Sequence, residues 1–146
     1  MKKVVITSGF FNPIHIGHMN LMKGAKELGD FLVVIVNNDA QVKIKGSIPF
    51  MSEQERMQII KDIRHVDEVF LSIDSDGYIP ESLKEVARKY PGELIFAKGG
   101  DRNFDNLPES EKLVCKSFNI KIVSGVGGGK VQSSSELLRK IKTADS

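Results

Sequence analysis

Two histidines, His15 and His18, follow a short apolar run near the N-terminus of this 146-residue chain. The run Lys3–Ser8 is typical of a buried strand, and apolar residues recur at helical spacing from Gly17 to Leu28. The histidines therefore lie where a strand passes into a helix, whose first N–H groups and partial positive charge favour phosphate. As neutral donors or as imidazolium ions, both could stabilise negative charge that builds up on phosphate oxygens.

The rest of the sequence predicts strands that alternate with helices. Further strands are expected at Phe31–Asn37, Val66–Ile73, Glu93–Ala97 and Ile120–Val123. Helices are expected at Ser52–Ile63, Pro80–Tyr90 and Pro108–Phe118, and a last one follows the serines near the C-terminus. This alternation predicts an α/β fold, a single-domain, Rossmann-like, doubly wound parallel sheet of five strands over residues 1–146. Ligands of such a sheet bind beyond the carboxyl ends of the strands.

Two lysines and an arginine follow the second predicted strand. Lys43 and Lys45, in a loop that contains Gly46, could both contact a triphosphate, or could be solvated surface side chains. Arg56 is expected on the first turns of a helix, where it could bind substrate or pair with Glu53 at the surface. The residues alone leave both choices open.

A glycine-rich segment follows the fourth predicted strand. Gly100 allows the backbone to approach a ligand closely. Asp101 could hold a ribose, a substrate hydroxyl or a magnesium ion, with a plain turn as the alternative. Arg102 is the neighbouring candidate for a contact with substrate.

Three consecutive serines, Ser133, Ser134 and Ser135, precede the last predicted helix, and Arg139 lies about one turn inside it. The serines could simply cap the helix. Together with backbone N–H groups and the guanidinium, they could instead form a cradle for phosphate.

Composition limits the class of partner. With 21 Lys and Arg against 19 Asp and Glu, the net charge of +2 is too small to favour nucleic acid. No apolar run approaches about 18 residues, no signal peptide is recognisable, and the chain has one cysteine. We therefore expect a cytoplasmic protein without a membrane partner. His65 and Cys115 supply no nearby third ligand for the histidine pair, so no metal site is expected.

The string G-F-F-N-P-I-H-I-G-H over residues 9–18 is similar to the H-x-G-H signature of the nucleotidyltransferase superfamily. That superfamily includes cytidylyltransferases and the pantetheine-phosphate and nicotinate-nucleotide adenylyltransferases. The three serines resemble its S-[ST]-[ST] signature. The spacing to Arg139, with the stretches Lys98–Asp101 and Arg64–Val69, looks most like heptose-phosphate adenylyltransferases. Asn12 departs from the pattern, because many sugar-phosphate and glycerol-phosphate members have aspartate there.

This resemblance implies transfer of AMP or CMP from an NTP to a small phosphomonoester such as a sugar 1-phosphate, with release of pyrophosphate. Mg²⁺ would accompany the NTP. The residues implied to be catalytic are His15, His18, Lys43, Lys45 and Arg139. Those implied to bind the nucleotide are Gly9, Phe10, Phe11, Asn12, Gly17, Gly100, Asp101, Ser133, Ser134 and Ser135. Those implied to bind the acceptor are Lys45, Arg56 and Arg102.

Other functions are compatible with the same residues. The chain lacks the R-T-E-G-I-S-T-T string of glycerol-phosphate cytidylyltransferases, so ATP is favoured over CTP. A flavin- or nicotinate-mononucleotide adenylyltransferase is the alternative within the enzyme class. A non-catalytic nucleotide-binding regulator is the alternative outside it, although the presence of both histidines argues against this class. The resemblance is also compatible with a homodimer.

Overall fold

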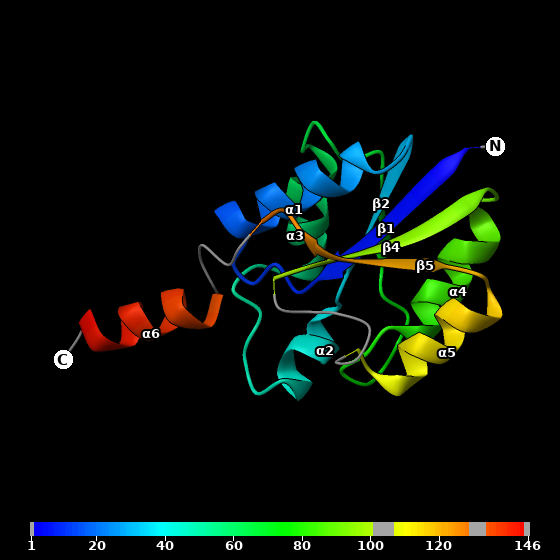
Figure 1. Cartoon of the computed structure of the whole chain (residues 1–146). Coiled ribbons are helices and arrows are strands. Elements are labelled where there is room, and N and C mark those ends of the chain that lie inside the picture. Colours follow the sequence, from blue (N-terminus) through cyan, green and yellow to red (C-terminus); the bar gives the residue numbers. More distant parts are fainter. Residues whose placement is uncertain (1, 101–106, 129–133, 145–146) are drawn as a thin grey trace.

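Five parallel strands form the sheet at the centre of the molecule, which is a computed structural model that describes residues 2–100, 107–128 and 134–144 (Figure 1). The strands are β1 (Lys3–Gly9), β2 (Phe31–Val36), β3 (Glu68–Leu71), β4 (Glu93–Gly99) and β5 (Lys121–Val126). They lie in the order β3-β2-β1-β4-β5, and every neighbouring pair is parallel. The predicted five-stranded parallel sheet is confirmed, and β1 with its histidine loop is its central strand.

Helices cover both faces of this sheet. In chain order they are α1 (Ile16–Glu27), α2 (Asp39–Ile44), α3 (Glu53–Lys61), α4 (Pro80–Lys89), α5 (Glu109–Ser117) and α6 (Ser134–Ala144). Figure 1 shows α1 and α3 on one face and α4 and α5 on the other. None of these helices is long and apolar enough to cross a membrane.

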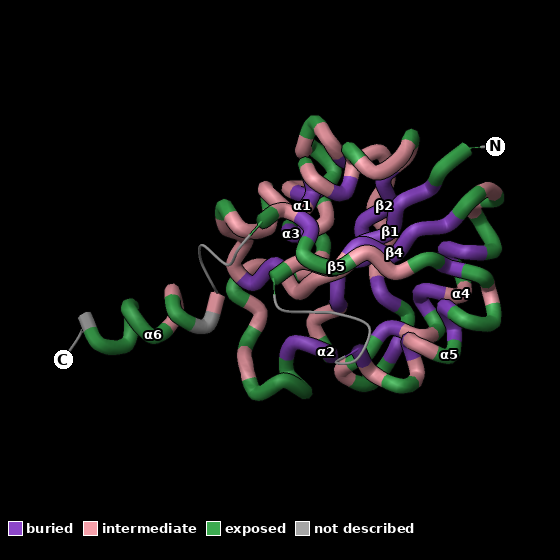
Figure 2. The backbone as a smooth tube through the Cα atoms, viewed as in Figure 1, coloured by how far each residue is buried: buried purple, intermediate pink, exposed green. Residues whose placement is uncertain are grey.

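The two faces of the sheet hold two separate apolar clusters. On one face Met22 of α1 and Ile60 of α3 are buried with Val5 of β1. On the other, Leu83 of α4 and Val114 of α5 are buried in a cluster that also contains strand residues. Successive strand residues face opposite sides, so strands buried on both sides need continuous apolar runs. The buried colour in Figure 2 is accordingly concentrated along the strands.

One helix was not expected from the sequence. The segment predicted as a loop after β2 begins with helix α2, which Asn38 caps by accepting from Gln41 N at 2.9 Å. Gln41 closes a reciprocal capping box, since its Oε1 accepts from Asn38 N. The helix ends before Gly46, whose positive φ of 82° stops it. Lys43 therefore lies in the last helical turn and Lys45 is the C-cap, which corrects the expectation of a lysine loop.

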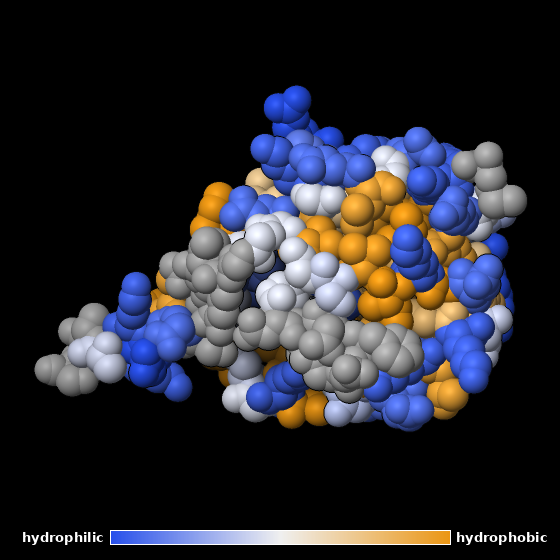
Figure 3. Space-filling model, viewed as in Figure 1, coloured by the Kyte–Doolittle hydropathy of each residue, from blue (hydrophilic) through white to orange (hydrophobic). Residues whose placement is uncertain are grey.

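The structure also differs from the prediction at the edge of the sheet, and its C-terminal helix lies away from the sheet. Strand β5 is at the edge of the sheet and extends to Val126, three residues beyond its predicted end. Apolar side chains gather on the surface over β5 and α5 (Figure 3). Helix α6 projects away from the sheet, so Ile141 on it is 54% exposed (Figures 1 and 2).

Candidate active site

A pocket of about 470 Å³ lies where the strands reach their carboxyl ends. Its wall combines the end of β1, the first turns of α1, the end of β4, the loop after β3 and the start of α5. The predicted site residues that line it are Gly9, Phe10, His15, Gly17, His18, Lys45, Gly100 and Ser134. The volume is within the range of small-molecule sites.

The two histidines cap helix α1 with their side chains. His15 is the N-cap, and its Nδ1 accepts from Gly17 N at 3.1 Å. His18 Nδ1 accepts from the backbone N–H of His15, also at 3.1 Å. The two rings stack with centroids 3.8 Å apart, and the ring of Phe11 meets His18 edge-on at 4.9 Å. Helix capping therefore holds both imidazoles together in the pocket wall.

This pattern determines the protonation state of the pair. In a neutral imidazole one nitrogen accepts and the other donates. Both Nδ1 atoms accept, so Nε2 carries the proton in each ring. Burial, and secondly the neighbouring His15, lower the pKa of His18 to about 4, and burial also lowers the pKa of His15. Of the two states left open by the sequence, the structure favours neutral Nε2–H donors.

Two glycines allow close contacts between segments that line the pocket or lie beside it. A Cβ on Gly9 would lie 2.8 Å from the ring of Phe11, which is buried at a positive φ of 51°. Gly127 has a φ of 86°, and a Cβ there would lie 2.8 Å from the backbone of Asn20 in α1. The chain after β5 can thus approach helix α1 closely beside the histidines.

Asn12 contacts protein backbone instead of facing the pocket. Its Nδ2 donates to Ile48 O at 2.8 Å, and its Oδ1 accepts from Phe50 N at 2.6 Å. An aspartate could accept the second bond but could not donate the first. This placement corrects the expectation that Asn12 binds nucleotide, and it gives a structural reason for asparagine at this position.

Arg56 connects the ends of β1 and β2 from a fully buried position. Its Nη1 donates to Phe10 O and to Asn37 O, each at 2.7 Å, and its Nε donates to Met51 O at 3.1 Å. Its Nη2 pairs with Asp39 Oδ1 at 2.7 Å. A planar guanidinium can satisfy several carbonyls at once, so Arg56 holds the loops that form the pocket floor.

The position of Arg56 corrects both expectations for this residue. The surface pair with Glu53 does not form, because Glu53 Oε1 accepts from Asp39 N instead, at 2.8 Å. The Arg56 side chain is 0% exposed, so it is not presented to substrate. Its role is to position the residues that line the pocket.

The two lysines differ in their relation to the pocket. Lys45 lines it, with Nζ 5.1 Å from the centroid of the Phe10 ring. A Cβ on Gly77 would lie 3.8 Å from Lys45 Cε, so the lysine reaches the loop after β3. Lys43 is exposed on α2 outside the pocket wall, because the helix turns it away.

The described part of the predicted phosphate cradle is not assembled. Ser134 Oγ donates to Pro13 O at 2.8 Å and so contacts the histidine loop. Arg139 is 70% exposed and pairs with Glu136 on α6. Five helical residues beyond Ser134 add about 7 Å along the axis, and α6 points outwards, so Arg139 lies outside the pocket wall.

Some predicted residues lie outside the described part of the chain. These are Asp101, Arg102 and Ser133, together with the side chain of Ser135. Within the described ranges, no three His, Cys, Asp or Glu side chains gather in a way that could hold a metal ion.

Comparisons with known proteins agree with this geometry. The family model described as cytidylyltransferase-like matches residues 6–141. The chain belongs to this family. The predicted superfamily is thus confirmed, and the protein is a nucleotidyltransferase of the adenylyltransferase or cytidylyltransferase type.

Three individual proteins illustrate how similar this chain is to its relatives. A FAD synthase from Thermococcus sibiricus is 38% identical over 124 residues, which are 84% of this chain and 80% of the relative. The bifunctional protein HldE of Koribacter versatilis is 36% identical over 129 residues, 87% of this chain but 25% of that protein. The crystal structure of the lipopolysaccharide core biosynthesis protein from Thermoplasma volcanium has a TM-score of 0.67 at 30% identity, covering 85% of this chain and 96% of that one.

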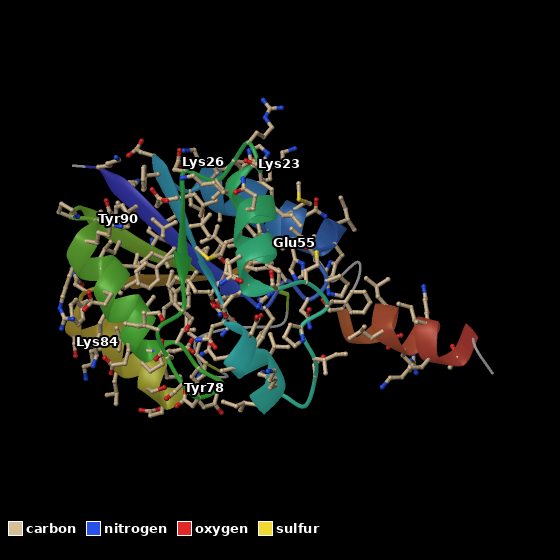
Figure 4. The ribbon with its side chains drawn as sticks, turned by 180° about the vertical axis from the view of Figure 1, so that it is seen from behind. Lys23, Lys26, Glu55, Tyr78, Lys84 and Tyr90 are labelled. Carbon is tan, nitrogen blue, oxygen red and sulfur yellow. The ribbon has the colours of Figure 1, made fainter. Side chains whose placement is uncertain are left out.

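Several pocket residues of this family member were missed by sequence reasoning. Tyr78 and Ile79 follow β3, and Glu111 is on the first turn of α5. Gln41 Nε2 donates to Tyr78 O at 2.9 Å, which holds the loop after β3 beside α2 (Figure 4). Their position in the sequence could have indicated Tyr78 and Ile79, because this loop, like those of the predicted site residues, follows the carboxyl end of a strand.

We expect Arg56→Lys to lower the free energy of unfolding by about 3 kcal/mol. Lysine retains the charge but lacks the planar fork, so buried carbonyls lose their donors. Urea denaturation measures the loss. The control is Arg88→Lys, whose exposed pair with Glu85 should contribute less than about 1 kcal/mol. Equal stabilities of the two variants would show that Arg56 does not hold the pocket loops.

The histidine assignment predicts a specific titration. Long-range ¹H–¹⁵N NMR spectra should show His18 as the neutral Nε2–H tautomer from pH 8 to pH 5.5, with protonation near 4. An unfolded histidine has a pKa of about 6.5, so the unfolded state takes up the proton first. This group therefore lowers the free energy of unfolding as the pH falls from about 6.5 to about 4.

The matched variants for that titration are His18→Asn and His65→Asn, the second at a site outside the pocket wall. Urea denaturation at pH 7.5 and pH 4.5 should show a smaller pH dependence for His18→Asn than for wild type and for His65→Asn. A His18 ring that titrates near 6.5, or that carries its proton on Nδ1, would contradict the assignment.

Proposed function

We propose that this nucleotidyltransferase transfers AMP from ATP to flavin mononucleotide (FMN) and releases FAD and pyrophosphate. The observation that carries the proposal is the likeness to FAD synthases over most of both chains, shown by the 38% identical relative from Thermococcus sibiricus. A second, from Thermoplasma volcanium, is 32% identical over 94% of this chain and 92% of its own length. These relatives favour the flavin alternative over the sugar 1-phosphate acceptor.

The proposed reaction needs no nucleophilic side chain. A phosphate oxygen of FMN attacks the α-phosphorus of ATP and forms the new P–O bond. The bond from that phosphorus to the bridging oxygen of the β-phosphate breaks, and pyrophosphate leaves with the electron pair. The FMN phosphate is ionised near pH 7, so the protein has to align the reactants and stabilise charge.

The pocket offers groups suited to that task. The Nε2–H groups of His15 and His18 would donate to the α-phosphate oxygens, where charge increases in the transition state. The N-terminus of α1 adds a positive potential beside them. Neutral donors do not attract a phosphate by net charge, so they act where oxygens approach within hydrogen-bond distance. Mg²⁺ would enter with ATP, held mainly by phosphates and water.

The aromatic residues of the pocket wall suit a flat acceptor. Phe10 and Tyr78 both line it, and Lys45 lies close to the Phe10 ring. Aromatic residues favour stacking with a planar ring, and an ammonium group can bind a phosphate as a point charge. We therefore assign the FMN phosphate to Lys45 and the ring to the aromatic side.

A sugar-phosphate acceptor is the second candidate. It is favoured by the 36% identity to the bifunctional protein HldE, of which this chain spans about a quarter. The likeness to the lipopolysaccharide core biosynthesis protein agrees with it as well.

The deciding experiment incubates the wild-type protein with ATP and either FMN or a hexose or heptose 1-phosphate. Chromatography quantifies FAD, and a coupled assay quantifies pyrophosphate. We expect FAD formation with kcat/KM at least about tenfold higher than for the sugar phosphates, and lower rates with CTP. Pyrophosphate release with a sugar phosphate but none with FMN would overturn the flavin proposal in favour of the second candidate.

The two lysines provide a matched pair of variants. Lys45→Ala should raise the KM for FMN by about tenfold or more with a smaller effect on kcat, because the ammonium contacts a group charged before and during the reaction. Lys43→Ala removes the same charge two residues away and should stay within about twofold of wild type. Steady-state kinetics with either substrate varied gives both numbers. Equal effects of the two variants on the KM for FMN would show that Lys45 acts only through the net charge of the protein and not through a contact with the phosphate.

A further inference from the structure

We propose that Asn37 is a specificity-determining residue for the acceptor, and that its Oδ1 accepts a hydrogen bond from a hydroxyl group on the carbon chain of that substrate. The proposal rests on the proposed function, in which this chain is the ribityl chain of FMN. It gives a role to a residue directly after β2 that the transfer of AMP does not itself require.

Asn37 is buried in the pocket wall and has most of its polar atoms paired. The residue is 4% exposed and lines the pocket. Its backbone N–H donates to Gly9 O at 3.0 Å, and its carbonyl accepts from Arg56 Nη1 at 2.7 Å. In the side chain, Nδ2 donates to Gln41 Oε1 at 3.0 Å. Among the described residues, none donates to Asn37 Oδ1.

The orientation of the Asn37 amide is determined by Gln41. Gln41 Oε1 also accepts from Asn38 N at 3.1 Å, and a backbone N–H can only donate. The other end of the same side chain, Nε2, donates to Asp76 O at 2.7 Å and to Tyr78 O at 2.9 Å. Since Gln41 presents an oxygen to Asn37, the Asn37 atom that meets it has to be the NH₂ group. The oxygen is therefore the atom left for another partner.

The unpaired oxygen of Asn37 faces the pocket. A buried acceptor without a partner costs about 1–3 kcal/mol, so native structures rarely contain one. In the described part of this chain, no fully buried side-chain nitrogen or oxygen lacks a hydrogen bond. Oδ1 is therefore accessible, and the space that Asn37 borders is the pocket. A donor on a bound substrate would complete its hydrogen bonding.

The location assigns Asn37 to the middle of the acceptor. Gln41 connects it to Tyr78, and Lys45 lies one turn further along the chain, where its N–H donates to Gln41 O at 3.2 Å. The proposed function assigns the FMN phosphate to Lys45 and the flavin ring to the aromatic residues. Asn37 then lies beside the part of FMN that joins the two, which is the ribityl chain with its three hydroxyl groups.

The chemistry of an amide oxygen selects a particular kind of group. It accepts hydrogen bonds and cannot donate them, so it pairs with a hydroxyl and not with an ionised phosphate. Lys45, which only donates, has the opposite preference. Together the two residues favour a phosphate that is followed by a hydroxylated chain. A site that pairs a substrate hydroxyl discriminates against an analogue without it, because its own polar group is then left unpaired.

A purely structural role of Asn37 predicts a different pattern. In Asn37→Ala, Gln41 Oε1 keeps its bond from Asn38 N, so no buried acceptor loses its only donor. If the substitution acted only by moving the loop at Tyr78, it would raise the KM for every flavin acceptor by the same factor. A direct bond instead makes the effect depend on one particular hydroxyl group.

The test combines Asn37→Ala with substrates that each lack one hydroxyl, the 2′-, 3′- and 4′-deoxy analogues of FMN. In wild type, we expect one analogue to raise the KM by about fivefold or more relative to FMN, as for an acceptor left unpaired. Asn37→Ala should raise the KM for FMN by a similar factor. In this variant, the KM for that analogue should equal the KM for FMN, because the bond is already lost.

Two controls accompany this cycle. The KM for ATP should change by less than about twofold in Asn37→Ala. Gln54→Ala, which removes an amide from an exposed position on α3 outside the pocket wall, should match wild type with all four acceptors. Thermal melts establish that the variants fold. If Asn37→Ala does not fold, Asn37→Ser, which keeps a small polar side chain beside Gln41, is judged by the same criteria.

The negative results are distinguishable. If wild type forms FAD but folded Asn37→Ala keeps its KM for FMN, or if each deoxy analogue has the same relative effect in both proteins, the role of Asn37 is wrong and the proposed function stands. If wild type forms no FAD from FMN, the proposed function fails, and with it the assignment of Asn37 that rests on it.

Discussion

The hydrogen bonds that the two histidines make to the backbone at the start of α1 are the constraint on which the site depends. Each Nδ1 atom is used in capping the helix, so each Nε2 must carry the proton. Burial keeps the pKa of His18 near 4, which preserves this neutral state at the pH of most assays. The same bonds that begin a helix thus fix the orientation and the tautomer of two potential phosphate ligands. Fold stability and site chemistry are coupled there, because a change that removes the donor also removes a cap.

The loops around the histidines are held by bonds from side chains to backbone. Arg56 connects the ends of β1 and β2, Asn12 holds the segment at Ile48, and Gln41 holds the loop after β3. These are polar groups at the end of an otherwise apolar sheet, where strand pairing no longer satisfies the backbone. A pocket built in this way is largely formed before ligand binds, which favours the alignment that phosphoryl transfer requires.

The sequence predicted the sheet and most helices because continuous apolar runs and helical spacing are local signals, as in Phe31–Val36. It missed α2, since a six-residue helix has too few turns for a periodic pattern, although the Asn38 and Gln41 capping pair marks its start. Arg56 was misassigned because its burial depends on carbonyls that converge from distant segments. Glu111 is one acid on an amphipathic helix, and only the packing of α5 brings it to the pocket.

We propose that the paired histidines act as neutral donors to the phosphate that is transferred. The most direct test of this role is the single-turnover rate of nucleotidyl transfer by His18→Ala at saturating ATP and acceptor, together with the Kd for ATP. We expect a rate about 10²–10³-fold below wild type with a Kd for ATP within about twofold, as for loss of a transition-state donor. A folded His18→Ala enzyme with a rate close to that of wild type would contradict it.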